Sequence, residues 1–391
     1  MIKEVALSEC CKIINGSTPS RVVPDFWGGE IHWFTPKDLS GLEGKYVDEA
    51  PEKISEAGYN SCSTTMVPAF SLLLTSRAPI GHIAINKRAV CTNQGFKSLV
   101  PNISVDINYL YYCFKKMVPV LQDMGNGATF KELSKLTLEK IQIPLPPLET
   151  QKKIAAIMDA ADAYRQKTKA LIEKYDELAQ SLFLEMFGDP VKNEKGWRKE
   201  KMEKICKKVT DGTHDTPQRL TEGVKFITGK HIRPFLIDYE NSDYVTDQVH
   251  NEIFKRCNPE LGDVLYTNIG VNLGTAALNV VDYEFSMKNV ALLKPKEEFI
   301  KGRFLEFFLN NQNVKSKLLS SVSAGGAQQF LSLKVIRDIE VIIPPFNNQN
   351  IFAEKVIEIE KQRSLSIKAL EKSEELFNSL LQKAFNGTLI I

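Results

Sequence analysis

Two long stretches of the chain carry apolar residues at alternating three- and four-residue steps. In the first, between Pro147 and Gly188, the stripe consists of Ile154, Ile157, Ala161, Tyr164, Thr168, Leu171, Tyr175, Leu178 and Leu182. This spacing is typical of a coiled-coil seam and predicts one helix from Glu149 to Phe187. The second stretch has a looser stripe, made of Phe352, Val356, Ile359, Arg363, Leu370, Phe377, Leu381 and Ala384. A long helix with one apolar stripe needs a partner, so we expect these two helices to pair antiparallel.

The segments outside these stretches have a different pattern. Short apolar runs, such as residues 71–76 and 81–85, are separated by Gly, Pro and Asn, which indicates strands and turns. Residues 109–117 and 303–319 are instead expected to be helical. The parts of the chain outside the long helices are therefore predicted to be mixed α/β.

The chain also repeats itself once, at an offset that drifts between roughly 193 and 200 residues. Landmarks that recur are residues 15–19 with 211–217, 31–37 with 224–230, 74–77 with 265–268, 127–130 with 326–330, and 143–147 with 343–345. Each copy then reaches a glutamine, Gln151 or Gln349, and one of the long helices. Two copies indicate one duplicated module, since a solenoid needs three or more units.

The expected architecture is α+β with four segments. Residues 1–147 form the first globular domain, 148–188 the first long helix, 189–345 the second globular domain, and 346–391 the second long helix with a C-terminal tail. We expect the helices to form an antiparallel coiled coil that separates the two globular domains, in a pseudo-two-fold arrangement.

Composition limits the domain number, the cysteine chemistry and the cellular location, but it does not indicate a function. With 391 residues, 43% of them hydrophobic and 25% charged, the chain is long enough for two cores. None of the seven cysteines sits in a C-x-x-C pair, so we expect reduced core thiols. Glu4 and Glu9 interrupt the apolar stretch that a signal peptide would need, and no apolar stretch is long enough to span a membrane. These features predict a cytoplasmic protein with no membrane partner. The net charge of +2 neither indicates nor excludes nucleic acid, because 50 basic residues can gather on one face.

Three motifs resemble catalytic sites and fail on their chemistry. The run 343–346, Ile-Pro-Pro-Phe, has Ile343 where an adenine methyltransferase needs a polar residue for the target amine. Asp25 and Glu43 imitate a nuclease site, yet both lie beside glycines that indicate turns, and the second copy does not repeat them. Residues 223–231 are one residue too long for a phosphate-binding loop and place His231 where Ser or Thr should hold magnesium. The five histidines show no metal-ligand spacing, so we predict no catalytic centre, no cofactor and no metal.

Two globular modules alternating with two long helices, with Pro-Leu-Pro-Pro-Leu-Glu-Thr-Gln at 144–151 before the first helix and Phe-Gly-Asp-Pro at 187–190 after it, closely resemble the specificity subunits of type I restriction-modification systems. The matching stretch before the second helix, 344–349, is less regular. The resemblance implies a non-catalytic subunit whose globular parts are target-recognition domains. It also implies double-stranded DNA as ligand, with an asymmetric bipartite site whose spacer the helices set. The implied protein partners are two modification (methyltransferase) subunits and restriction (endonuclease) subunits. The alternative from another class is a coiled-coil scaffold or adaptor that binds no DNA.

Sequence readout needs Arg, Lys, Asn or Gln side chains at base edges and on phosphates. The duplicated loops supply such residues at matched places: Lys37, Arg77, Asn93, Gln94, Lys97, Asn126 and Thr129 in the first module, and Lys230, His231, Arg233, Asn268, Lys288, Asn289, Gln328 and Gln329 in the second. Docking of the modification subunits is expected on the outward faces of the helices, at Lys153, Arg165, Lys169 and Glu173 of the better-defined first helix.

Overall fold

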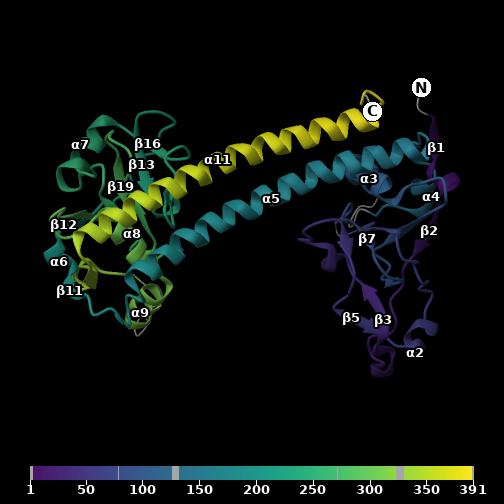
Figure 1. Cartoon of the computed structure of the whole chain (residues 1–391), viewed down its shortest axis with the longest axis horizontal. Coiled ribbons are helices and arrows are strands. Elements are labelled where there is room, and N and C mark those ends of the chain that lie inside the picture. Colours follow the sequence, from purple (N-terminus) through teal and green to yellow (C-terminus); the bar gives the residue numbers. More distant parts are fainter. Residues whose placement is uncertain (1–2, 78, 126–131, 271, 323–329, 390–391) are drawn as a thin grey trace. The chain divides into compact units, whose positions relative to one another are not determined.

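The computed structural model describes residues 3–77, 79–125, 132–270, 272–322 and 330–389. It forms two compact units. The first consists of Met1–Lys169 with Lys368–Ile391, and the second of Ala170–Ile367. Each unit therefore contains one half of each long helix, α5 (Leu148–Phe187) and α11 (Phe346–Phe385) (Figure 1). Among the described residues, no helix is both long and apolar enough to cross a membrane.

The first unit is built on small sheets joined by short helices. Its strands are β1 (Glu4–Ala6), β2 (Cys11–Asn15), β3 (Trp27–Phe34), β4 (Tyr46–Val47), β5 (Glu52–Ile54), β6 (Leu72–Leu74), β7 (Ile83–Asn86), β8 (Cys91–Thr92), β9 (Lys97–Pro101) and β10 (Gln142–Pro144). Its helical segments are α1 (Leu7–Cys10), η1 (Pro24–Phe26), η2 (Pro36–Leu39), α2 (Glu56–Asn60), α3 (Ile107–Met124) and α4 (Lys135–Glu139). The strands pair in the orders β2-β9-β6-β7-β4, β5-β3-β8 and β1-β10.

The second unit repeats this arrangement with small additions. Its strands are β11 (Arg198–Lys201), β12 (Cys206–Asp211), β13 (Val224–Thr228), β14 (Ile232–Arg233), β15 (Leu236–Ile237), β16 (Asp243–Val245), β17 (Val264–Tyr266), β18 (Ala276–Leu278), β19 (Ser286–Lys288), β20 (Ala291–Pro295) and β21 (Glu340–Ile343). Its helical segments are α6 (Met202–Ile205), η3 (Gly229–His231), α7 (Asp247–Arg256), α8 (Gly302–Asn310), α9 (Gln312–Val322) and α10 (Leu333–Arg337). The strand orders are β12-β20-β17-β18, β16-β13-β19 and β11-β21. They match those of the first unit except that β4, at the edge of its five-stranded sheet, has no counterpart in the four-stranded sheet, and β14-β15 is a separate ribbon.

The helix predicted over 303–319 is interrupted at one residue. Asn311 ends α8, and its side-chain oxygen accepts hydrogen bonds from the backbone N–H groups of Asn313 (3.0 Å) and Val314 (3.3 Å). An asparagine that caps backbone donors in this way begins a new helix. The chain therefore forms α8 and α9 in place of one continuous helix, whereas the helix predicted at 109–117 lies within α3.

The long helices pack along each other in both units. In the second unit, the ring of Phe352 on α11 lies 5.7 Å from that of Phe183 on α5, and Arg363 forms an ion pair with Asp176 at 2.7 Å. From the first contact to the second, the residue number rises along α11 and falls along α5, so the two helices run antiparallel. In the first unit, Phe377 of α11 joins the core cluster that contains the start of α5.

The predicted seam on α5 is only partly buried. Ile154 and Thr168 are buried as expected, but Tyr164, Leu171 and Leu178 are exposed. The buried positions that the spacing missed are Ala155, Met158, Ala179, Phe183 and Phe187. They are buried because each half of the helix packs against the globular core of its own unit as well as against α11.

A buried glutamine fixes the start of each long helix in the same way. The side-chain oxygen of Gln151 accepts a hydrogen bond from the backbone N–H of Asp106 (2.9 Å), and its amide donates to the carbonyl oxygens of Ser104 (2.9 Å) and Pro146 (2.8 Å). The side-chain oxygen of Gln349 accepts from the N–H of residue 301 (2.9 Å), and its amide donates to the carbonyls of residues 299 (3.1 Å) and 344 (2.9 Å). Both glutamines are fully buried, so each ties its long helix to the adjacent globular core.

Candidate nucleic-acid interface

Three loops of the first unit lie together, following β2, β3 and β8. The backbone N–H of Ser17, after β2, donates to the carbonyl of Thr92 at 2.9 Å, and the hydroxyl of Thr18 bonds the side chain of Gln94. The N–H of Asn93, after β8, donates to the carbonyl of Phe34 at the end of β3 (2.9 Å). The structure thus brings the loop of Asn93 and Gln94 next to the loop that begins at residue 16.

The turn after β3 is held by its own side chains and presents Lys37 to solvent. Asp38 accepts hydrogen bonds from the backbone N–H of Thr35 (2.6 Å) and from its hydroxyl (2.8 Å). Such a capping box fixes a short helical turn. Lys37, inside this turn, is exposed, and so is Gln94 in the neighbouring loop. Asn93 is partly buried, and its side-chain oxygen accepts from the N–H of Gly95 at 2.8 Å.

The second unit assembles the equivalent loops around a hollow. The N–H of Thr213 donates to the carbonyl of Met287 (3.0 Å), and the ammonium of Lys288 bonds the hydroxyl of Thr216. The hollow has a volume of 410 Å³ and includes the predicted contacts Lys230, Lys288 and Asn289 in its lining. Three side chains chosen from the sequence for DNA contact therefore share one concave surface.

A glycine allows the close loop contact in each unit. A Cβ on Gly16 would lie 2.0 Å from the carbonyl oxygen of Asn93, and one on Gly212 would lie 2.0 Å from that of Met287. No side chain fits at those distances. The glycine at the first position of each duplicated loop is therefore required for the loops to meet.

Three of the predicted DNA contacts are buried. His231 is 3% exposed and its Nδ1 accepts from the backbone N–H of Thr228 (2.9 Å), so it occupies the capping position that Asp38 holds in the first unit. Burial lowers the pKa of His231, which keeps the ring neutral at pH 7. Asn268 is 6% exposed, and Lys97 is 8% exposed with its ammonium 3.2 Å from the carboxylate of Glu132. These three side chains lie inside the fold in this structure, and their contact with DNA stays a prediction.

The other predicted contacts remain predictions. Arg77 is partly exposed and lies 3.9 Å from the carboxylate of Glu132, and Arg233 on β14 is exposed. Four further residues lie outside the described part of the chain, namely Asn126, Thr129, Gln328 and Gln329.

The predicted docking residues divide into two groups. Lys153, Lys169 and Glu173 are exposed on α5. Arg165 faces inward, because its guanidinium pairs with Asp162 at 2.6 Å and lies 4.7 Å from the ring centroid of Phe377. Arg165 therefore packs against α11 in this structure, and its role in docking stays a prediction.

One matched pair of arginines lies just beyond the recurring segments 15–19 and 211–217. After Pro19 and Pro217 the chain continues with one variable residue and then an arginine, Arg21 and Arg219. In the structure each arginine is partly exposed and paired with a carboxylate. Extending the repeat by two residues would have found them.

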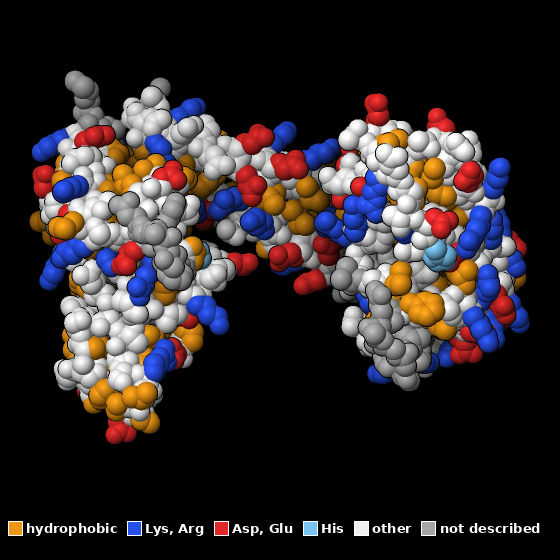
Figure 2. All heavy atoms as spheres, turned by 180° about the vertical axis from the view of Figure 1, so that it is seen from behind, with side chains coloured by type: hydrophobic (Ala, Val, Ile, Leu, Met, Phe, Trp, Pro, Cys, Tyr) orange, Lys and Arg blue, Asp and Glu red, His pale blue; other side chains and the backbone are white. Residues whose placement is uncertain are grey.

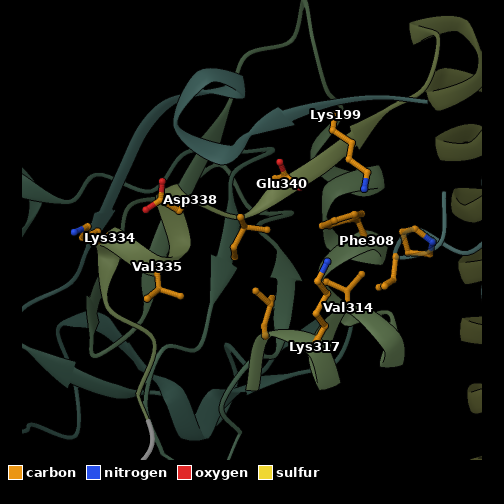
Figure 3. Close-up of a pocket in the computed structure, with 12 residues that line it drawn as sticks. Lys199, Phe308, Val314, Lys317, Lys334, Val335, Asp338 and Glu340 are labelled. Carbon is orange, nitrogen blue, oxygen red and sulfur yellow. The ribbon is translucent and has the colours of Figure 1, made fainter. Parts of the chain in front are cut away.

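The 610 Å³ hollow drawn in Figure 3 lies away from these loops, between α8, α9 and α10 and the ribbon β11-β21. Its lining is mainly apolar, with Phe308, Val314 and Val335, and the ends of Lys199 and Lys317 turn toward one another beside Phe308 (Figure 3). A second hollow, of 400 Å³, lies at the corresponding place in the first unit, against α3, α4 and β10. Neither is formed by the loops that carry the predicted DNA contacts. Among the described residues, no group of three metal-ligating side chains occurs.

Comparison with known proteins identifies the family. A family profile described as "Type I restriction modification DNA specificity domain" matches residues 2–174. The type I restriction enzyme MjaIX specificity subunit of Methanocaldococcus jannaschii is 33% identical over 361 residues, which cover 85% of this chain and 81% of that protein. This chain belongs to the type I restriction enzyme specificity subunits. The MjaVIII specificity subunit of the same organism is 24% identical over 98% of this chain and 92% of its own length.

Solved specificity-subunit structures share the fold. The S subunit from M. genitalium matches with a TM-score of 0.58 at 16% identity, covering 98% of this chain and 96% of that one. A chain from a solved type I R-M assembly matches with a TM-score of 0.61 at 17% identity, covering 99% and 98%. Specificity subunits are the non-catalytic components of their systems. The role of this chain is accordingly DNA sequence recognition, and neither methyl transfer nor cleavage.

Proposed function

We propose that this chain directs a type I restriction-modification complex to an asymmetric DNA site in two parts, with one half-site read by each unit. The observation that carries the proposal is the pair of interfaces described above. They share a loop layout and strand order but differ in the side chains that they present.

The differences between the interfaces indicate different half-sites. The first unit carries Asn93 and Gln94 just after β8, whereas the second carries Lys288 at the end of β19 and Asn289 just after it. Amide side chains pair well with adenine, while lysine favours the acceptors of guanine. Two surfaces with different donors select different bases, so the complete site is asymmetric.

The two units are proposed to be copies of one module, joined by an antiparallel coiled coil of α5 and α11. Matching strand orders, the matched glutamines Gln151 and Gln349, and the matched hollows beside α4 and α10 support the duplication. The contacts between α5 and α11 inside each unit support antiparallel packing.

The outward faces of the long helices are proposed to bind two modification subunits, with restriction subunits completing the complex. In the second unit, α5 exposes Leu171 and Leu178 at a seven-residue spacing, and α11 exposes Ile357 and Leu365. Figure 2 shows hydrophobic side chains among charged ones along these helices. An apolar stripe at heptad spacing that the chain itself leaves exposed fits a helix of a partner subunit.

The test is to map methylation in cells that carry this chain and its modification subunits. We expect one asymmetric two-part motif, absent when this chain is omitted. Replacing Lys288 and Asn289 with alanine should change or relax one half-site and leave the other unchanged. Lys207→Gln, which removes a positive charge from an exposed position on β12, is the matched control and should leave the motif intact.

Two results would contradict the proposal. If the complex methylates a symmetric motif, the proposed asymmetric site is excluded. If the chain has no sequence-specific affinity for DNA in the presence of its partners, readout of any half-site is excluded and the scaffold alternative is favoured. Reversing the charges of Lys153, Lys169 and Glu173 together should reduce co-purification of the modification subunits. Undiminished co-purification would place their docking surface elsewhere.

A further inference from the structure

In both units the arginine that follows the Thr-Pro loop pairs with a carboxylate on an equivalent edge strand. Arg21 forms a two-pronged pair with the carboxylate of Glu52, with distances of 2.5 and 2.9 Å. Arg219 donates to the carboxylate of Asp243 at 2.6 Å. Both carboxylates lie on an edge strand that pairs antiparallel with the strand leading to the exposed lysine, β5 with β3 and β16 with β13.

The register of these strands makes the match close. Glu52 lies opposite Trp33 on β3, and Asp243 lies opposite Phe226 on β13. Trp33 and Phe226 occupy the same position of the sequence repeat, since residues 31–37 align with 224–230. The arginine and its carboxylate therefore come from equivalent places in both units, although the two loops differ in length by two residues.

Arg219 lies beside the predicted DNA contacts, and Arg21 lies against the tryptophans of β3. Arg219 lines the 410 Å³ hollow together with Lys230 and Lys288, and Lys230 shares the carboxylate of Asp243 at 3.1 Å. The guanidinium of Arg21 lies 3.8 Å from the ring centroid of Trp27, so a flat surface supports it from one side. The arginine side chains are 53% and 43% exposed, so a ligand can reach both without moving the backbone.

We propose that Arg21 and Arg219 each bind a phosphate of the DNA backbone and set the position of their unit on the duplex. The inference rests on the proposed function. Residues that read bases should differ between the two units, because the half-sites differ. A residue that contacts phosphate carries no sequence information and can be the same in both. Guanidinium binds phosphate with the same two-pronged geometry that it uses for carboxylate.

Glu52 and Asp243 act as placeholders in this scheme. Before DNA arrives, each carboxylate holds the arginine in an ordered orientation. When DNA binds, a phosphate oxygen takes over one or both hydrogen bonds, and the nearby carboxylate opposes binding by repulsion. Removing the carboxylate should therefore strengthen DNA binding, whereas removing the arginine should weaken it.

The experiment measures binding of the complex of this chain with its modification subunits to its own methylation site and to a scrambled duplex, over a range of salt. The variants are Arg21→Gln, Arg219→Gln and the double variant. Each lost phosphate contact lowers the slope of log K against log salt by about 0.9. The loss of affinity between about 50 and about 200 mM salt should then be about 3.5-fold smaller for each single variant and about 12-fold smaller for the double variant. The bases specified should not change.

Three control variants separate contact from structure. Glu52→Gln and Asp243→Asn break the same ion pairs but keep the arginines, and we expect tighter binding with an undiminished slope. Arg198→Gln removes a charge from β11, where the arginine pairs with Glu200 at 3.3 Å, and it should leave the slope unchanged.

The outcomes distinguish the two proposals. A wild-type complex that binds both duplexes equally overturns the proposed function. A wild-type complex that is specific, with arginine variants of unchanged slope, overturns only the phosphate contact. Weaker binding by Glu52→Gln and Asp243→Asn would show that the ion pairs are structural, and an altered motif in the arginine variants would show that they read bases; either result refutes this inference.

Discussion

Replacing Gln349 with alanine should destabilise the second unit by about 3 kcal/mol, because the side chain makes three hydrogen bonds in a fully buried site and each is worth about 1 kcal/mol. The deletion leaves one N–H donor and two carbonyl acceptors buried without this partner, so the estimate is conservative. Gln151→Ala should have the same effect on the first unit, because Gln151 makes the matching three bonds. Gln382→Ala, at an exposed position of α11, is the control and should change stability by less than about 0.5 kcal/mol.

Thermal and denaturant unfolding of the full chain measure the global effect, and for a unit of this size a loss of about 3 kcal/mol lowers the midpoint by roughly 6 to 12 °C. Amide hydrogen exchange shows which segments of the chain lose stability. Protection should fall around residues 299–301 and 344–351 in the Gln349 variant and around 104–106 and 146–151 in the Gln151 variant. A loss below about 1 kcal/mol, or protection unchanged at those segments, would refute the view that these glutamines anchor the long helices.

Two further predictions follow from close contacts and from burial. Gly16→Ala and Gly212→Ala should each weaken binding to the cognate DNA by about tenfold, the cost of one lost base contact, because the added Cβ displaces a recognition loop. Lys207→Gln, at an exposed position of β12, is the control for a DNA-binding titration, and equal affinities for all three variants would exclude the steric argument. Burial raises the pKa of Glu306 to about 7, although Arg303 opposes the shift. The stability that the protonated Glu306 carboxyl contributes is therefore fully present below the unfolded-state pKa and is lost as pH rises through 7. Relative to Glu306→Gln, the wild-type free energy of unfolding should fall by on the order of 2 to 3 kcal/mol between about pH 5 and about pH 8, and parallel pH profiles in urea unfolding would contradict this.

The sequence predicted the elements well where spacing alone decides them. The helix expected at Glu149 to Phe187 is α5, which begins one residue earlier. The apolar run at 71–76 contains β6, and the run at 81–85 covers β7 except for its last residue, Asn86. The same spacing could not choose between two apolar stripes on α5. The buried stripe is selected by the globular core beside the helix, and that core is formed by residues distant in sequence.

The candidate site was predicted at the level of loops more than of side chains. Lys230, Lys288 and Asn289 were chosen because their positions recur, and they line one hollow. His231 was also predicted to contact DNA. Its structural equivalent is the capping residue Asp38, and a histidine in that role gives no sign in the sequence. Burial of Lys97 against Glu132 depends on a contact across 35 residues, which a pattern of neighbours does not reveal.

In each unit the first and last strands of the globular part pair with one another. Glu4 lies opposite Pro144 in β1-β10, and Arg198 lies opposite Ile343 in β11-β21. Neighbouring strands are about 5 Å apart, so the chain enters and leaves the module at one place, beside the start of a long helix. A module closed in this way behaves as a cassette. Under the proposed function, genetic recombination between related genes, with crossovers in the segments that encode these ribbons, would exchange one proposed half-site preference without rebuilding the helices. New DNA specificities could therefore arise in a single exchange.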